Sequence, residues 1–120
     1  MYSPLLVLSI VLPSVYAFRI GLYTNGRCTG QRSQFTANLA SGCSNERAGT
    51  FGGIINEWES EKDNKVLLAT YSDRNCCHAN LIQMVDWTDG CVALEGTANS
   101  WRVVNPDDPD AGKEGEDYTC

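Results

Sequence analysis

The chain has 120 residues, of which nine are Lys or Arg and fifteen are Asp or Glu, so its formal net charge is −6. It has no basic field that could attract phosphate backbones, which excludes a nucleic acid as the expected partner. Six cysteines in so short a chain are typical of the disulfide framework of an exported protein.

Residues 1–17 are predicted to be a signal peptide. Apolar residues fill most of positions 5–12, Pro13 interrupts any helix there, and the small side chain of Ala17 suits signal peptidase. The apolar run is too short to cross a bilayer, so we expect no membrane insertion, and a buried N-terminal strand is the alternative. Cleavage after Ala17 would remove 17 of the 120 residues and leave 103 in a single secreted, extracellular domain, 18–120.

The secreted part contains an internal repeat, with one copy at about 19–56 and the other at about 66–105. In each copy an aromatic residue stands five positions before a cysteine, and a second cysteine, preceded by glycine, follows fifteen positions later. The matched cysteines of the two copies lie 48 positions apart. These coincidences of residue type and spacing predict two copies of one structural unit.

Short apolar segments separated by turn-forming residues predict strands rather than helices. In chain order, the expected strands are 19–23, 34–36, 53–56, 65–71, 81–85, 91–94 and 100–104. One further strand, the third of the first copy, is inferred only from the repeat, and the polar segment 57–64 is a linker or one exposed helical turn. Eight strands in two fours predict an all-β fold, in which two four-stranded Greek-key repeats pack as a small disulfide-bonded sandwich.

The last segment, 105–120, is an acidic C-terminal tail. It contains six acids and one lysine, which gives a net charge of −5. Such a stretch is usually solvated. Its final residue, Cys120, is nevertheless expected to tie the end of the chain back to the body.

Two aromatic positions introduce a family resemblance. Tyr23 is followed seven residues later by Gly30 inside the duplicated unit, and this pattern resembles the βγ-crystallin motif, whereas the same spacing from Tyr71 reaches His78. Crystallin-like domains include microbial killer toxins and a bacterial metalloprotease inhibitor. The leader, the run Tyr-Ser-Asp-x-Asn-Cys at 71–76 and a late Gly-Cys also resemble small cysteine-rich secreted fungal proteins, among them candidate effectors in virulence.

The crystallin resemblance raises the question of calcium, because many crystallin-type domains bind it. The corresponding positions are 48–53 and 95–100, of which the first has no carboxylate and the second keeps only Glu95 and Ser100. Calcium requires about six to eight oxygen ligands, several of them charged. We therefore expect no metal and no cofactor.

A hydrolase would use residues that the chain does contain. Glu57, Glu59 and Glu61 are alternating carboxylates, and His78 is the one histidine. A solvated connector and a surface histidine are the simpler interpretation. The run Cys76-Cys77-His78 does not suit zinc, because adjacent cysteines rarely point at one metal, and disulfide sulfurs are not nucleophiles. We expect no catalytic residue and no enzyme activity.

Candidate contact residues for a partner are Trp87, Arg32 and Arg74. Trp87 lies in an acidic loop before Cys91, and an exposed aromatic residue there would be a plausible anchor, because aromatic side chains dominate binding energy at interfaces. Covering the core from the loop is the alternative role for this tryptophan.

Symmetry between the two copies guides the expected disulfides. The expected pairs are Cys28–Cys43, Cys76–Cys91 and Cys77–Cys120. Bonds inside each copy close short loops, whereas crossed bonds between copies preserve the same symmetry but require the copies to meet at equivalent points. The two cysteines without an equivalent are left to each other.

These features together predict a secreted, non-enzymatic binding protein. The resemblance implies a fungal effector or elicitor-like protein that acts on a host or competitor molecule. The alternatives are a crystallin-like antimicrobial toxin or protease inhibitor, and a small secreted hydrolase. The expected partner is an extracellular or host protein, and the protein itself is expected to be a monomer.

Overall fold

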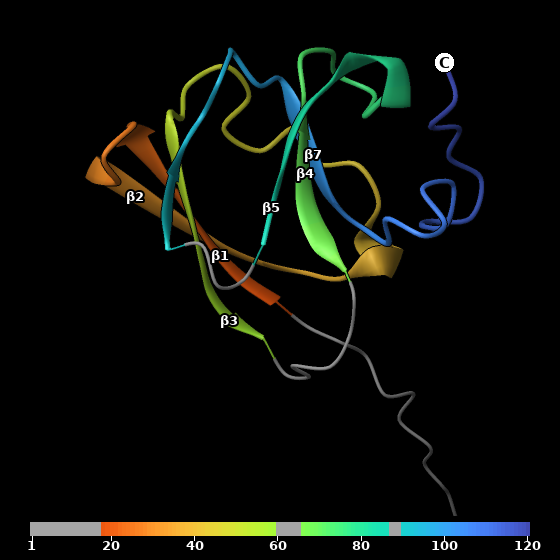
Figure 1. Ribbon diagram of the computed structural model, residues 1–120, viewed down its shortest axis with the longest axis horizontal. Coiled ribbons are helices and arrows are strands. Elements are labelled where there is room, and N and C mark those ends of the chain that lie inside the picture. Colours follow the sequence, from red (N-terminus) through yellow and green to blue (C-terminus); the bar gives the residue numbers. More distant parts are fainter. Residues whose placement is uncertain (1–17, 60–65, 87–89) are drawn as a thin grey trace, which may run out of the picture.

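The structure is a computed structural model that describes residues 18–59, 66–86 and 90–120 (Figure 1). The predicted signal peptide 1–17 and the candidate contact Trp87 lie outside the described residues. Within those ranges the protein is all-β, and no helix has the length and hydrophobicity needed to span a membrane. The elements are β1 (Phe18–Asn25), β2 (Thr29–Ala37), η1 (Leu39–Ser41), β3 (Gly53–Glu59), β4 (Leu67–Tyr71), η2 (His78–Asn80), β5 (Leu81–Val85), β6 (Cys91–Ala93) and β7 (Ser100–Val104), where η denotes a short 3-10 turn.

The first sheet has the antiparallel order β2-β1-β3-β6. In β1 the side chains of Ile20 and Leu22 are fully buried, as expected for alternate residues that face a core. The β1–β2 hairpin depends on Gly30, which has a φ of +83° and approaches Thr24 so closely that a Cβ atom would lie 2.1 Å from its Oγ1. Only glycine fits this position.

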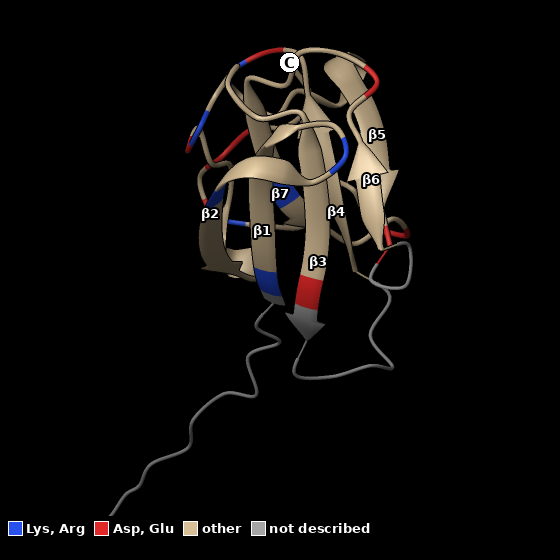
Figure 2. Ribbon diagram, turned by 90° about the vertical axis from the view of Figure 1, so that its left-hand side faces the viewer, with Lys and Arg blue, Asp and Glu red and all other residues tan. Residues whose placement is uncertain are grey.

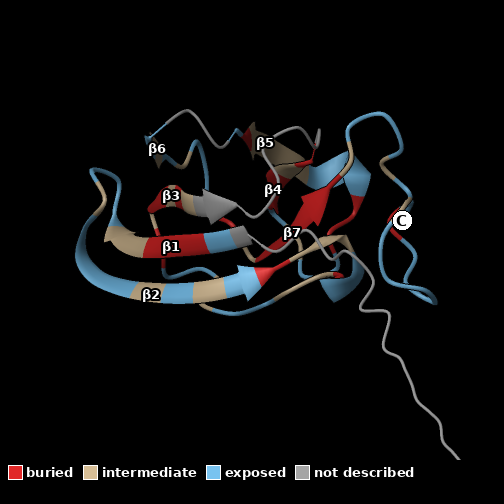
Figure 3. Ribbon diagram, turned by 90° about the horizontal axis from the view of Figure 1, so that it is seen from below, coloured by how far each residue is buried: buried red, intermediate tan, exposed pale blue. Residues whose placement is uncertain are grey.

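The second sheet has the antiparallel order β5-β4-β7 and is buried on both faces at its centre. Trp101 and Val103 of β7 belong to the core between the sheets, and the ring of Trp101 lies 5.6 Å from that of Phe35. Val104, on the other face, packs in a second cluster with Tyr71 of β4. Every residue of β7 is buried for this reason (Figure 3). Charged residues lie mainly in the loops (Figure 2).

Each sheet receives a segment from the other half of the chain. Strand β6 follows β5 in the sequence, yet it pairs with β3, with Ile55 opposite Cys91. Ser44 forms an isolated antiparallel bridge with Trp101 of β7, through two backbone hydrogen bonds of 2.9 and 3.0 Å. The prediction of eight strands was therefore wrong within the described residues, which contain seven. The expected third strand of the first copy is reduced to this single bridge.

The disulfides are Cys28–Cys91, Cys43–Cys76 and Cys77–Cys120, and they leave no free cysteine. The last pair confirms the prediction, whereas the expected pairs Cys28–Cys43 and Cys76–Cys91 were wrong. The cause is the placement of β6 against β3, which brings Cys91 to the β1–β2 turn. The sulfur of Cys28 lies 3.6 Å from the carbonyl oxygen of Ile54, the residue preceding the partner of Cys91 in the β3–β6 register.

The acidic tail is anchored to the body at its end, although most of its residues are exposed. We call residues 106–120 the C-terminal strap. Tyr118 of the strap is buried and belongs to the cluster of Tyr71 and Val104, and its carbonyl oxygen accepts a hydrogen bond of 2.8 Å from the backbone of His78. The Cys77–Cys120 disulfide fastens the end of the strap. The expectation that Cys120 ties this segment back to the body is confirmed.

Candidate functional site

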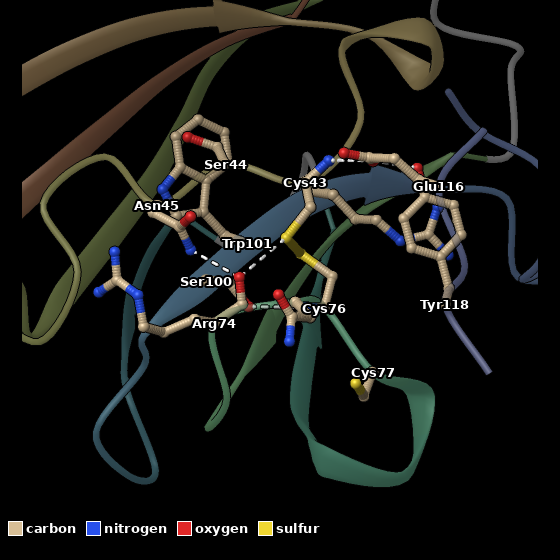
Figure 4. The surroundings of a disulfide bond; sticks show 12 residues. Cys43, Ser44, Asn45, Arg74, Cys76, Cys77, Ser100, Trp101, Glu116 and Tyr118 are labelled. Atoms are coloured by element: carbon tan, nitrogen blue, oxygen red, sulfur yellow. Dashed lines mark hydrogen bonds between the residues drawn. A yellow bond between two sulfur atoms is a disulfide. The ribbon is translucent and has the colours of Figure 1, made fainter. Parts of the chain in front are cut away.

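The Cys43–Cys76 disulfide joins the segment around Cys43 to the loop that carries Arg74 (Figure 4). Two open grooves meet at Cys43. One groove, of about 360 Å³, has Arg74 and Asn75 on one side and Glu116 and Asp117 of the strap on the other. We call it the Arg74 groove. The second groove, of about 560 Å³, lies between the end of β2 and residues 41–47. Cys43 and Asn45 line both.

The loop that carries Arg74, residues 72–77, is held by side chains from neighbouring segments. Three successive carbonyl oxygens accept hydrogen bonds: that of Ser72 from Asn99 Nδ2 at 2.8 Å, that of Asp73 from Ser100 Oγ at 2.6 Å, and that of Arg74 from Asn45 Nδ2 at 2.8 Å. Satisfied backbone groups keep a loop in one conformation. The loop is thus fixed before any partner arrives.

The Asp73 carboxylate and the cysteines tighten the same loop. Asp73 accepts a hydrogen bond of 2.9 Å from the backbone of Asn75 and one of 3.2 Å from that of Cys77. Cys76 has a positive φ of 55°, and its backbone donates to Ser100 Oγ at 3.1 Å. Two disulfides begin at Cys76 and Cys77, so the C-terminal end of the loop is covalently anchored.

Arg74 itself is exposed, and its side chain extends away from the disulfide (Figure 4). The one ion pair within the described part of the chain joins Arg32 to Glu57, so the guanidinium of Arg74 is not neutralised by a carboxylate there. A fixed backbone with an exposed, unneutralised guanidinium is suited to bind a carboxylate of a partner.

The opposite wall of the Arg74 groove is acidic. Glu116 accepts hydrogen bonds from the Cys43 backbone at 2.9 Å and from the Tyr118 hydroxyl at 2.6 Å. Partial burial raises the pKa of Glu116, but these hydrogen bonds to its charged form, together with the positive charges of Lys113 and Arg102, outweigh that effect and lower the pKa below its usual value. Hydrogen bonds from Thr119 lower the pKa of Asp117 in the same way. The groove therefore presents both signs of charge at neutral pH.

The structure does not bring Arg32 to this groove. Its guanidinium forms two hydrogen bonds with the carboxylate of Glu57, of 2.7 and 2.5 Å, across the first sheet. The hydrogen bond to Glu57 is the main cause of the raised pKa of Arg32. Arg32 is thus committed to an intramolecular pair, whereas Arg74 is not.

The residues that a hydrolase would use are also separated. Glu57 lies in β3 of the first sheet, and His78 is an exposed residue of η2, which leads into β5 of the second sheet. The side chain of Glu59 and all of Glu61 lie outside the described residues. Glu57 therefore lies in a strand of the first sheet, and His78 lies in a turn that leads into the second sheet.

One cluster has the residue types of a metal site. Ligand atoms of Asp73, Cys77 and Cys120 lie within 4.8 Å of one another. Both sulfurs are joined in a disulfide, so neither is available as a thiolate ligand. Ser100, at the position that the crystallin resemblance assigns to calcium, is buried, and its hydroxyl is engaged by Asp73 and Cys76.

No model of a protein family, no curated protein and no solved structure matches the chain. Function is therefore inferred from the residues and their geometry alone.

Several residues of this surface were missed in the sequence. Asn45 and Glu116 are far from Arg74 in the chain, and no motif links them, while the sequence indicated Ser100 only as a candidate calcium ligand. Only the predicted closure by Cys120 indicated that the tail would reach the body. Their roles depend on the contact of distant segments, which spacing along the chain does not encode.

Proposed function

We propose first that the two halves of the domain are copies of one Greek-key unit that have exchanged their third strands, as in a βγ-crystallin-like fold. The pairing of β6 with β3, and of Ser44 with Trp101, supports this proposal. So do the equivalent positive φ angles of Cys28 and Cys76, 58° and 55°. The Cys28–Cys91 and Cys43–Cys76 bonds each join the first cysteine of one copy to the second cysteine of the other.

We further propose that the protein is a secreted, non-enzymatic binding protein, of the kind represented by fungal effectors, that acts on a host or competitor protein. The observation that carries this proposal is the fixed loop at 72–77, which presents the exposed guanidinium of Arg74 beside an open groove. A preorganised contact loses little conformational entropy on binding, and arginine is enriched among the residues that dominate interface energies. The partner is expected to place a carboxylate opposite Arg74.

The test is capture with the mature, oxidised protein, followed by affinity measurement on the purified partner. Arg74→Ala is compared with Arg27→Ala, a matched control that removes an exposed arginine from the β1–β2 turn. Arg74→Ala should weaken binding at least tenfold, about 1.4 kcal/mol, and Arg27→Ala should change it less than twofold. Equal binding by the wild type and Arg74→Ala would contradict the proposal.

The alternative functions give different results in the same experiment. A protease inhibitor would bind a protease and block its activity, and a toxin would act on cells without a protein partner. For an inhibitor, the Arg74 carbonyl is an unsuitable point of attack, because it accepts a hydrogen bond from Asn45. For a hydrolase, the double variant Glu59→Gln with His78→Ala would lose activity while its circular dichroism stays native.

A further inference from the structure

Arg102 is a buried cation beneath the C-terminal strap. It lies in the centre of β7, only 1% of it is exposed, and its guanidinium carbon is 3.6 Å from the centre of the Tyr118 ring. Its Nη1 donates to the carbonyl oxygen of Ala111 at 2.9 Å, and its Nη2 donates to that of Pro109. These three contacts belong to the strap, and the side chain of Tyr71 in β4 also interacts with Arg102.

No carboxylate pairs with this guanidinium within the described residues, where the one ion pair is that of Arg32 with Glu57. Its Nε is buried without a hydrogen-bond partner. A buried charge is unfavourable unless its surroundings compensate it. Here neutral carbonyl oxygens and an aromatic ring contact the guanidinium, and the carboxylate of Glu116 lies near enough to interact with it electrostatically. The two carbonyl oxygens, on adjacent guanidinium nitrogens, occupy the places that two oxygens of a carboxylate or phosphate would take.

The strap is held by few contacts other than its disulfide. Tyr118 is its one buried residue, and most of the remainder is exposed (Figure 3). Outside Arg102, its hydrogen bonds to the rest of the described chain are those of Asp107 and Asp108 with the adjacent Asn105, of Tyr118 with the His78 backbone and of Glu116 with the Cys43 backbone. Segments with little apolar burial open at low free energy. The Cys77–Cys120 bond is therefore the main restraint on the strap.

We propose that the strap is a releasable cover and that its release by thiol–disulfide exchange at Cys77–Cys120 uncovers Arg102 as a binding site for an oxyanion. In the exchange, an external dithiol reduces the bond: Cys77 and Cys120 become thiols, and the dithiol becomes a disulfide. The other two disulfides hold the body and do not involve the strap.

The position of Cys120 favours this step. Cys120 is exposed at the end of the chain, and Cys91 of the Cys28–Cys91 bond is exposed as well, whereas Cys76 of the Cys43–Cys76 bond is fully buried. Exchange requires access to a sulfur. Release also removes the acidic residues of the strap from the neighbourhood of Arg102, which would otherwise repel an incoming anion.

The experiment compares the oxidised mature protein with the variant Cys77→Ser/Cys120→Ser, in which the strap lacks its bond. Hydrogen exchange first reports release: the amides of His78 and Cys43, which donate to the strap, should exchange at least tenfold faster in the variant. Inorganic phosphate and acetate are then titrated separately, with ¹⁵N NMR of the Arg102 side chain as the readout. We expect saturable binding at least tenfold tighter in the variant. Tighter binding of phosphate identifies a phosphoryl ligand, and tighter binding of acetate identifies a carboxylate.

Two further variants, each made in the Cys77→Ser/Cys120→Ser background, keep the outcome specific. Arg102→Lys retains the charge but not the paired donors, so it should lose most of the increase in anion affinity that follows loss of the Cys77–Cys120 bond. Arg74→Ala should keep that increase. Loss of the increase in Arg74→Ala would place the anion in the Arg74 groove and overturn the proposal. Unchanged amide exchange, or equal anion affinity with and without the Cys77–Cys120 bond, would overturn it as well.

Discussion

Ser100 connects the Arg74 loop to β7 of the second sheet. Its hydroxyl donates to the Asp73 carbonyl at 2.6 Å and accepts from the Cys76 backbone at 3.1 Å, and the residue is fully buried. Ser100→Ala leaves two polar groups without a partner, so the free energy of unfolding should fall by about 1–3 kcal/mol. Urea denaturation measures the change. Ser72→Ala, which removes an exposed hydroxyl from the same loop, is the control and should have little effect.

Gly30 provides a second test, in which steric overlap is separated from backbone strain. Gly30→Ala introduces both, because φ is +83° and the new Cβ would lie 2.1 Å from Thr24 Oγ1. Gly115→Ala introduces the strain alone, since φ is +91° and no atom lies within 4 Å of the added carbon. Both should destabilise the protein, and Gly30→Ala should do so by more than about 1 kcal/mol. Equal midpoints of thermal unfolding for Gly30→Ala and Gly115→Ala would show that the β1–β2 hairpin can relax around Thr24.

At the scale of the elements, the stability that the strap contributes should depend on pH through Glu116. The pKa of Glu116 is lower in the folded protein than in the unfolded chain, so its stabilising effect is complete above the unfolded pKa, about 4.3. The effect is lost as pH falls through the lower, folded value. The stability difference between the wild type and Glu116→Gln should therefore shrink below about pH 4.

Glu114→Gln is the matched control for this measurement, because Glu114 is an exposed acid of the same strap. The difference in the free energy of unfolding between Glu114→Gln and the wild type should stay nearly constant over the same pH range. A Glu116→Gln difference that does not change with pH would mean that the bonds from Cys43 and Tyr118 do not favour the charged carboxylate.

At the scale of the whole molecule, the Cys28–Cys91 bond joins the β1–β2 turn to β6, two segments separated by 63 positions. Replacing both cysteines with serine should lower the free energy of unfolding by about 4 kcal/mol in the chain-entropy model. Peptide mapping without reduction should recover a peptide that links Cys28 to Cys91. A peptide that links Cys28 to Cys43 would contradict the placement of β6 beside β3.

The extent of the mature chain is also a property of the whole molecule. The signal-peptide prediction places the first secreted residue at Phe18, where β1 begins in the structure. The intact mass of protein recovered from the medium should correspond to residues 18–120 with three disulfides. Secreted protein that retains Met1 to Ala17 would contradict this prediction.

The sequence by itself determined the class of fold and most of its strands. Alternation of apolar residues and turn formers is a local signal, so the β1–β2 turn at Asn25-Gly26 and the segments 81–85 and 100–104 were correctly predicted. The tie of Cys77 to Cys120 followed from elimination once the other cysteines had been matched. These inferences required no knowledge of which strands are neighbours.

Only the tertiary structure decided how the halves meet. Whether β6 stays in the sheet of β5 or joins the other sheet does not alter the residue pattern, because an apolar face is buried in either case. That choice set the pairing of Cys28 with Cys91, and where the expected repeat predicted a further strand, only the bridge at Ser44 forms. The tertiary structure also decided which arginines are candidate binding residues. Arg74 and Arg102 are both arginines in polar or β contexts, and only the packing of Asn45, Ser100 and the strap around them leaves one exposed and the other buried.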